Sequence, residues 1–375
     1  MARSKKKNKK VSPLQTVGVS FVACLFGVVV GLIGSIGYSL SNVQNDEKEK
    51  NALKGKVYDD FQIHFLELGN IYAGDSIYVK AGDNDILIDA GSRPGSKDTI
   101  KEYVNEYCLD GKLEYVIATH AHQDHIAAFG CNDGIFYSYD IGTIIDFPLT
   151  NSSTATFNKY KEGRDYAISN GAKHYTALEC YENKNGAKST YTLGDNMSFE
   201  ILYNKYYEEE TSNENEYSVC VLFKYGTTKY LLTGDLEEKG EKYLAEHNAE
   251  LIKDCDLFKA GHHGSYTAST DELLDVVSPS ISVCTCVCGS PEYTKTEANM
   301  FPSQKYIDRI SKHTDKVYVT SLCEDYEEGK FTSMNGNVIV SSDGTNVDVA
   351  CSNNNTVLKD TEWFKNNRTC PEAWM

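Results

Sequence analysis

Three imidazoles and a carboxylate occur within six residues of this sequence, in the run Thr119-His120-Ala121-His122-Gln123-Asp124-His125. The residues just before it, 113–118, are mostly apolar and β-branched, so we expect a buried strand that ends where the histidines begin. Loops at strand ends commonly display reactive groups on a rigid frame. Imidazole nitrogen and carboxylate oxygen are ligands that suit zinc and similar ions. The run therefore predicts a metal-binding turn.

Two later stretches repeat this arrangement and could supply the further ligands that a pair of ions needs. The run Tyr230-Leu231-Leu232-Thr233-Gly234-Asp235 is an apolar strand that leads through a glycine to a carboxylate. The run Leu257-Phe258-Lys259-Ala260-Gly261-His262-His263-Gly264-Ser265 leads in the same way to two histidines. We therefore expect three strand ends to converge on one site.

Together with Ile86-Leu87-Ile88-Asp89-Ala90-Gly91, these stretches resemble the metallo-β-lactamase superfamily in their order along the chain. Three runs are similar in detail to the metallo-hydrolase domain of ComEC-type DNA-uptake proteins and of their free-standing, membrane-anchored relatives: 64–69, 232–237 and 262–265. The resemblance spans about residues 57 to 350. It implies an α+β fold, a four-layer αββα sandwich with two metal ions at one edge.

The resemblance also implies a set of metal ligands. The first ion would be bound by His120 and His122, the second by Asp124, His125 and His263, and Asp235 would bridge the two. The superfamily has a third histidine for the first ion, and the corresponding residues 212–218 contain none. Water, Asn215 or Glu214 could complete that site.

The adjacent histidines 262 and 263 would point in opposite directions on an extended chain, so only one of them can be a primary ligand. We predict that His263 is the ligand and that His262 is a phosphate contact or proton donor, because imidazole is an acid and base near neutral pH. Asp89 has two open interpretations, one in which it fixes a ligating imidazole and one in which it is an ordinary turn residue. We expect His64 to be a core histidine.

The expected cofactor is a pair of divalent ions, zinc by the ligand types, with manganese as the alternative. Two such ions about 3.5–4 Å apart hold a bridging water and lower its pKa towards neutrality. This chemistry fits hydrolysis, above all of phosphoesters. Asp124 could both bind a metal ion and orient the resulting hydroxide.

The N-terminal segment indicates a membrane anchor. Arg3 and five lysines lie within the first ten residues, residues 11–45 carry no charge, and the apolar stretch exceeds the roughly 20 residues of a spanning helix. The basic flank places the N-terminus in the cytoplasm and the large domain outside the cell. Gly27 and Gly31 have a spacing that could pair two such helices in a homodimer. We predict these segments: 1–13 basic tail, 14–40 transmembrane anchor, 41–56 linker, 57–350 hydrolase domain and 351–375 C-terminal tail or strap.

Composition limits the partners. The 375 residues include 54 acidic and 37 basic side chains, for a net charge of -17, which excludes a general basic surface for polyanions.

Cys284, Cys286 and Cys288 would share one face of a strand as packing groups. Residues 132–191 carry mixed signals, and we expect them to overhang the site.

Three functions remain open at this point. The first is an exterior metal-dependent hydrolase of phosphodiesters, acting on nucleic acid or on a phosphorylated envelope polymer. The second is a hydrolase of another bond, a lactam or thioester, in the same fold. The third is a non-catalytic binding module at the cell surface. Fold resemblance alone does not decide the substrate.

Overall fold

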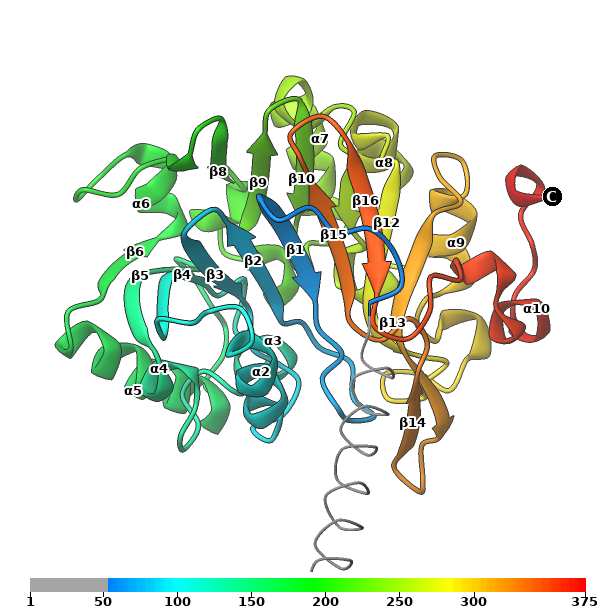
Figure 1. The fold of residues 1–375 in the computed structure, drawn as a ribbon, viewed down its shortest axis with the longest axis horizontal. Coiled ribbons are helices and arrows are strands. Elements are labelled where there is room, and N and C mark those ends of the chain that lie inside the picture. The colour runs from blue at the N-terminus through cyan, green and yellow to red at the C-terminus, as the bar shows by residue number, and fades with distance from the viewer. Residues whose placement is uncertain (1–52) are drawn as a thin grey trace, which may run out of the picture. The chain divides into compact units, whose positions relative to one another are not determined.

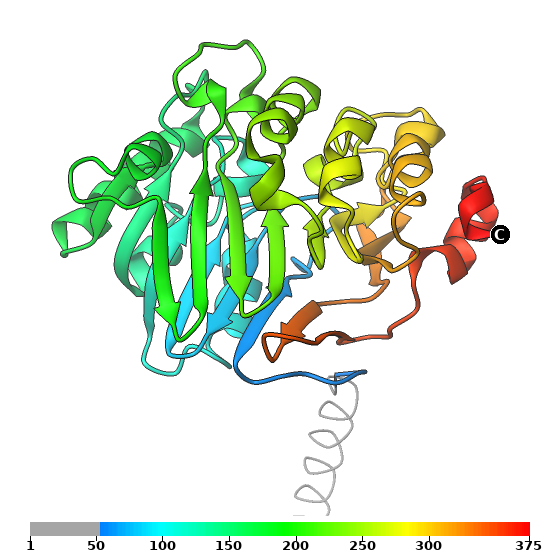
Figure 2. The same ribbon diagram turned by 90° about the horizontal axis from the view of Figure 1, so that it is seen from above.

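Two eight-stranded β-sheets form the centre of the protein, which we describe from a computed structural model covering residues 53–375 (Figures 1 and 2). In the first sheet the strand order is β16 (Val347–Cys351), β15 (Val338–Ser342), β1 (Phe61–Phe65), β2 (Ile77–Ala81), β3 (Asn84–Ile88), β4 (Lys112–Ile117), β5 (Asp140–Asp146) and β6 (Lys173–Thr176). In the second sheet it is β14 (Lys330–Ser333), β13 (Val317–Asp325), β12 (Ile281–Cys288), β11 (Leu257–Lys259), β10 (Thr228–Leu232), β9 (Cys220–Tyr225), β8 (Met197–Leu202) and β7 (Thr190–Gly194).

The two sheets pack face to face through aromatic side chains. Phe61 of β1 stacks on Tyr230 of β10, with ring centroids 5.0 Å apart, and Tyr115 of β4 meets Phe199 of β8 edge to face at 5.0 Å. All of these rings except that of Tyr115 are fully buried. Such contacts bury large apolar areas and fix how the sheets align.

The helices lie on the outside of the paired sheets (Figures 1 and 2). Those that follow strands of the first sheet are α2 (Ser96–Val104), α3 (Gln123–Ile126), α4 (Ile135–Ser138), α5 (Ala155–Ser169) and α6 (Ala177–Glu182). Those that follow strands of the second sheet are α7 (Glu238–Ile252), α8 (Asp271–Val277) and α9 (Gln304–Ile310), and the terminal α10 (Glu362–Asn367) comes after β16 of the first sheet. Short 3₁₀ helices are η1 (Lys205–Tyr207), η2 (Glu214–Tyr217), η3 (Gly261–Gly264), η4 (Glu297–Asn299), η5 (Leu358–Asp360) and η6 (Glu372–Trp374). The α+β two-sheet sandwich expected from the sequence is thus confirmed.

Parallel strands in each sheet bring chemically important residues to one edge. Strands β3 to β6 run parallel in the first sheet, and β10 to β13 run parallel in the second. The carboxyl ends of adjacent parallel strands meet at the same sheet edge, where ligands are commonly bound. Because β3, β4, β10 and β11 each end just before a predicted site residue, this edge holds the candidate site.

One expectation about the chain's organisation needs revision. Residues 132–191 do not simply overhang the site, because β5 and β6 extend the first sheet and α5 packs beside it. The C-terminal segment is folded onto the second sheet's outer core, where Leu358, Phe364 and Trp374 are buried.

The predicted anchor at 14–40 lies outside the described residues, as do the basic tail and residues 41–52 of the linker. Among residues 53–375, no helix combines the length and apolar character that crossing a membrane requires. The end of the predicted linker is tied to the domain, since Lys54 N donates a hydrogen bond to Cys351 O at 2.8 Å.

Candidate metal centre

Four buried side chains from three strand ends meet at the edge defined above. Asp124 and His125 lie in α3, behind the turn that follows β4, while Asp235 follows β10 and His263 lies in η3 after β11. Each contributes one nitrogen or oxygen atom to a group in which these atoms lie within 4.8 Å of one another. We call these four residues the ligand cluster. The sequence runs that predicted convergence therefore do meet in space.

Asp235 is at the centre of the ligand cluster. Its Oδ2 atom lies 3.1 Å from His125 Nε2 and 3.3 Å from His263 Nε2. His263 Nε2 is also 3.4 Å from Asp124 Oδ2. The side-chain nitrogen and oxygen atoms of these residues thus point into one small volume, as the ligands of a metal ion do.

The donor atoms of the cluster are left free to bind a cation. Within residues 53–375, His125 Nε2, His263 Nε2 and Asp235 Oδ1 are buried and have no hydrogen-bond partner. A buried polar atom without a partner is unfavourable. Imidazole nitrogen with carboxylate oxygen is the donor set of zinc sites, so these residues fit a divalent ion.

The opposite nitrogen of each ligating imidazole is fixed by a partner. His125 Nδ1 lies 2.7 Å from Asp89 Oδ2, and His263 Nδ1 lies 2.9 Å from the carbonyl oxygen of Thr285. Asp89 also accepts hydrogen bonds from Thr119 N and Thr119 Oγ1, at 2.8 and 2.7 Å. These contacts orient the rings so that Nε2 faces the cluster. Of the two interpretations of Asp89, the geometry favours the one in which it fixes an imidazole.

Charge in the buried cluster is set by mutual contacts. Burial alone would lower the pKa of His125, but the carboxylates of Asp235 and Asp89 raise that pKa well above its usual value. Burial would raise the pKa of Asp235, but His125 and His263 hold it well below its usual value. Burial, together with the neighbouring His125 and His122, keeps the pKa of His120 well below its usual value.

His120 and His122 lie beside the ligand cluster and form a pair of their own. His120 Nε2 is 3.0 Å from His122 Nδ1, and the ring centroids of His120 and His125 are 4.2 Å apart. The two histidines are thus adjacent to the cluster, as a second ion beside the first would require. Their carboxylate neighbour would be Asp235.

The backbone that follows β3 approaches the backbone of α3 closely at Gly91. A Cβ atom at Gly91 would lie 1.5 Å from the carbonyl oxygen of Asp124. Only glycine fits at this position, and the stretch that follows β3 can therefore pack directly under α3.

Comparison with known proteins shows which proteins this chain resembles. The sequence profile described as the metallo-beta-lactamase superfamily matches residues 69–130, which include the turn at 119–125. Three curated relatives are similar to this chain. They are ComE operon protein 3 of Bacillus subtilis (22% identity, 69% of this chain and 32% of that one), Competence protein ComA of Neisseria gonorrhoeae (29%, 41% and 21%), and Recombination protein 2 of Haemophilus influenzae (28%, 30% and 13%).

The chain is thus similar to the metallo-beta-lactamase superfamily over residues 69–130. The curated relatives support the ComEC-type branch that the sequence resembles. This chain spans only 13% to 32% of their lengths, so the likeness covers one part of each relative. The superfamily fold implies divalent metal ions, and the ligand cluster is the place in this chain that fits one.

The segment that lacks the superfamily's third histidine does not offer a ready substitute in Glu214. The carboxylate of Glu214 accepts hydrogen bonds from Thr150 Oγ1 and Asn151 N, at 2.6 and 2.7 Å, and is thereby committed to the loop at 150–151. Asn215 is the better placed residue, because its Oδ1 atom is buried without a partner in the described chain.

The adjacent histidines 262 and 263 are not on an extended chain, as the sequence predicted. Both have positive φ values, 45° and 56°, in the turn η3. His262 Nδ1 lies 2.8 Å from Glu237 Oε1, and its Nε2 is 3.9 Å from Asp235 Oδ2. His263 lies in the ligand cluster, while His262 lies at its border and is partly exposed.

Three residues near the cluster were not singled out from the sequence. Tyr293 OH donates a hydrogen bond to Asp124 Oδ2 at 2.7 Å. Lys259 Nζ, fully buried, lies 2.9 Å from Asp75 Oδ2 and 3.6 Å from Asp235 Oδ1. Asp75 in turn lies behind His263, with Oδ1 3.3 Å from Nδ1. The sequence offered one signal for this group, Lys259 in the apolar strand before Gly261. A lysine in such a strand is buried and needs a buried anion as its partner.

Proposed function

We propose that this chain is a metal-dependent phosphodiesterase, anchored in the membrane and facing the outside of the cell, that cleaves nucleic acid or a phosphorylated envelope polymer. The observation that carries the proposal is the ligand cluster, in which Asp124, His125, Asp235 and His263 converge and the last three each have a buried polar atom with no hydrogen-bond partner in the described chain. A chain whose histidines served only for packing would pair these atoms.

The chain's own groups would bind the substrate and move protons. A pair of divalent ions held here would supply a Lewis acid and a water of lowered pKa. Asp124 is an ionised carboxylate held in place by Tyr293, and it is positioned to accept a proton from attacking water. His262 Nδ1 lies 2.8 Å from Glu237 Oε1, a contact that would orient the imidazole as a proton donor to the leaving oxygen.

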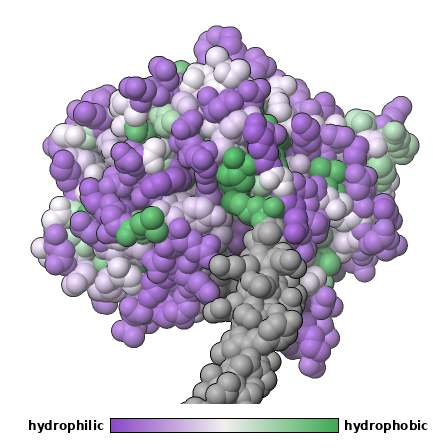
Figure 3. Space-filling model, viewed as in Figure 1, coloured by the Kyte–Doolittle hydropathy of each residue, from purple (hydrophilic) through white to green (hydrophobic). Residues whose placement is uncertain are grey.

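The surface limits how a polyanion could bind. The net charge of -17 disfavours contact away from the site. The face seen in Figure 3 is mostly hydrophilic, with small separate apolar patches and no broad apolar surface. Recognition would therefore depend on groups at the edge of the cluster, where Arg93 is partly exposed and pairs with Glu292 at 2.8 Å.

Two relatives are named for competence and recombination, Competence protein ComA and Recombination protein 2. These names support DNA as the first substrate to test. Membrane anchoring and exposure to the exterior rest on the sequence of residues 1–45 alone. They are tested by protease accessibility of the domain in intact cells, where a domain that is cleaved only after lysis contradicts the proposal.

The catalytic proposal is tested with the purified full chain in a non-ionic detergent. Bound metal is measured by mass spectrometry, and turnover is measured on bis(p-nitrophenyl) phosphate, single-stranded DNA, teichoic acid fragments and nitrocefin. We expect metal and phosphodiester turnover in the wild type, and loss of turnover without unfolding in Asp124→Ala and His263→Ala. His313→Gln, at a mostly buried histidine that lies outside the ligand cluster with Nε2 3.5 Å from Asp275 Oδ1, is the matched control and should keep full activity.

Other results would replace the proposal. Turnover of nitrocefin alone indicates a hydrolase of another bond in the same fold. Absence of both metal and turnover indicates a non-catalytic binding module, which the missing third histidine of the first site would then explain.

A further inference from the structure

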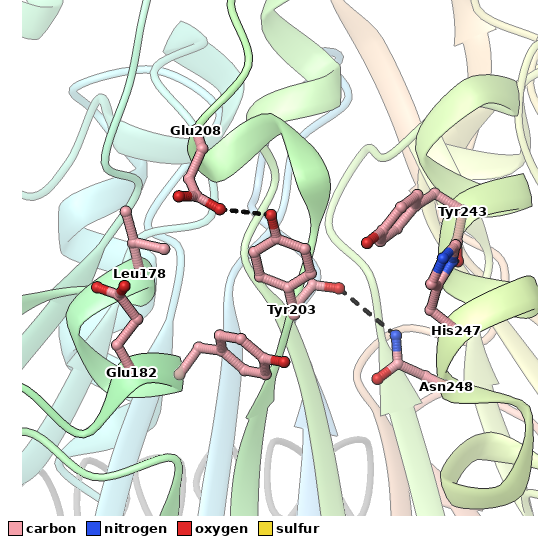
Figure 4. A pocket seen from close by; sticks show the side chains of 8 residues that line it. Leu178, Glu182, Tyr203, Glu208, Tyr243, His247 and Asn248 are labelled. Carbon is pink, nitrogen blue, oxygen red and sulfur yellow. Dashed lines mark hydrogen bonds between the residues drawn. The ribbon is translucent and has the colours of Figure 1, made fainter.

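A cavity lined by three tyrosines opens between α6, the end of β8 and α7 (Figure 4). Its volume is about 340 Å³, which is within the range of sites that bind small molecules. No residue of the ligand cluster lines it. The lining residues are Leu178, Tyr181, Glu182, Tyr203, Glu208, Tyr243, His247 and Asn248. We call it the tyrosine cavity.

Three tyrosine rings and one imidazole form the aromatic part of the cavity wall. The ring centroid of Tyr203 lies 4.7 Å from that of Tyr181 and 5.8 Å from that of Tyr243. The planes of Tyr203 and Tyr243 are inclined at 67°, so the two rings meet almost at a right angle. His247 stacks on Tyr243 at 3.8 Å with nearly parallel planes. His247 thus covers one face of Tyr243 and holds the ring in place.

Charge in the tyrosine cavity is negative. Glu208 accepts a hydrogen bond from Tyr203 OH at 2.5 Å, and Glu182 also lines the cavity (Figure 4). No lysine or arginine of residues 53–375 lines the cavity. The nearby Lys184 is paired with Glu182 at 2.8 Å. Within residues 53–375, no lysine or arginine forms an ion pair with Glu208. A cation entering the cavity would therefore meet a free negative charge.

We propose that the tyrosine cavity binds an alkylammonium cation, of which a quaternary ammonium group is the simplest form. Tyrosine faces attract such cations through the ring quadrupole, and the attraction is stronger where water is excluded. The carboxylate of Glu208 adds a direct charge interaction, whereas an anion would be repelled by both glutamates. The proposal goes beyond the proposed function, because it depends only on the geometry and charge of this cavity.

The test compares choline with its uncharged isostere, 3,3-dimethylbutan-1-ol. Binding to the full chain is measured by calorimetry and by ligand-observed NMR, in a non-ionic detergent that carries no choline headgroup. We expect choline to bind with a Kd on the order of 1 mM, and the isostere to bind at least about tenfold more weakly. Equal binding of the two, or no saturable binding of choline, overturns the proposal.

Variants locate the site. Tyr203→Leu removes a ring face and Glu208→Gln removes the charge while keeping the shape, and each should weaken choline binding about three- to tenfold. Tyr203→Phe keeps the ring and should retain binding. Tyr166→Leu, at an exposed tyrosine on α5 with 46% of its surface accessible, is the control and should bind as the wild type does. If choline affinity is the same in Glu208→Gln as in the wild type, the tyrosine cavity is not the site, whether or not Tyr203→Leu folds.

Discussion

Replacing Lys259 by methionine should destabilise the domain strongly, because the lysine is a fully buried cation between two carboxylates. Its Nζ lies 2.9 Å from Asp75 Oδ2 and 3.6 Å from Asp235 Oδ1, and it donates hydrogen bonds to the carbonyl oxygens of Gly234 and Ala260 at 3.0 and 3.1 Å. Methionine fills a similar volume but leaves buried negative charge uncompensated. Removing one partner of a buried ion pair typically costs about 3–5 kcal/mol.

A surface ion pair provides the matched control. Lys224 Nζ lies 3.0 Å from Glu200 Oε2, and both side chains are partly exposed. Lys224→Met should therefore change the free energy of unfolding by no more than about 1 kcal/mol. Both variants are measured by urea unfolding in the presence of a chelator, so that metal binding does not shift the equilibrium. If Lys259→Met lost no more stability than Lys224→Met, the claim that Lys259 stabilises the domain by compensating the buried charges of Asp75 and Asp235 would be refuted.

Three further predictions concern contacts around the site and one core histidine. Asp89→Asn should reduce zinc affinity about 10- to 100-fold, because Asp89 fixes the imidazole of His125 at 2.7 Å; competition with a chelating dye measures it, and unchanged affinity contradicts the role. Tyr293→Phe removes the 2.7 Å hydrogen bond to Asp124 and should slow phosphodiester hydrolysis about tenfold without lowering stability by more than about 1 kcal/mol; full activity would show that this bond is not used. Burial lowers the pKa of His64 to about 3, so its contribution to stability is complete above about pH 6.5 and is lost as the pH falls towards 3. The slope from this group is at most about 1.4 kcal/mol per pH unit, and urea unfolding at several pH values should give a smaller slope for His64→Phe than for the wild type.

The strands of the fold were largely predictable because their signals are local. The short apolar run at 113–118 corresponds to β4, and the strand expected to carry Cys284, Cys286 and Cys288 corresponds to β12. His64 is buried and hydrogen-bonded to Tyr103 and Gln62, as expected of a core histidine. Residues 132–191 were harder. The sequence of β6 is polar, and β5, although it contains Ile141, Ile144 and Ile145, is a short run among mixed polar segments.

The candidate site was predictable only where its residues follow a strand directly. Asp235 and His263 both come at such strand ends. Tyr293 contacts Asp124 across 169 residues, and the hydrogen bond from Thr285 to Asp75 spans 210, so neither contact leaves a periodic pattern in the sequence. The positive φ values of His262 and His263 were also missed, because non-glycine residues seldom adopt them and no local rule required them here.

The central claim is that the ends of β4, β10 and β11 together hold a divalent cation. Anomalous diffraction at the zinc absorption edge, from crystals of the protein grown with zinc, tests it most directly. The account predicts a strong anomalous peak bonded to His125 Nε2, His263 Nε2 and the carboxylate of Asp235. A zinc-loaded crystal with no peak within bonding distance of these three residues would contradict it.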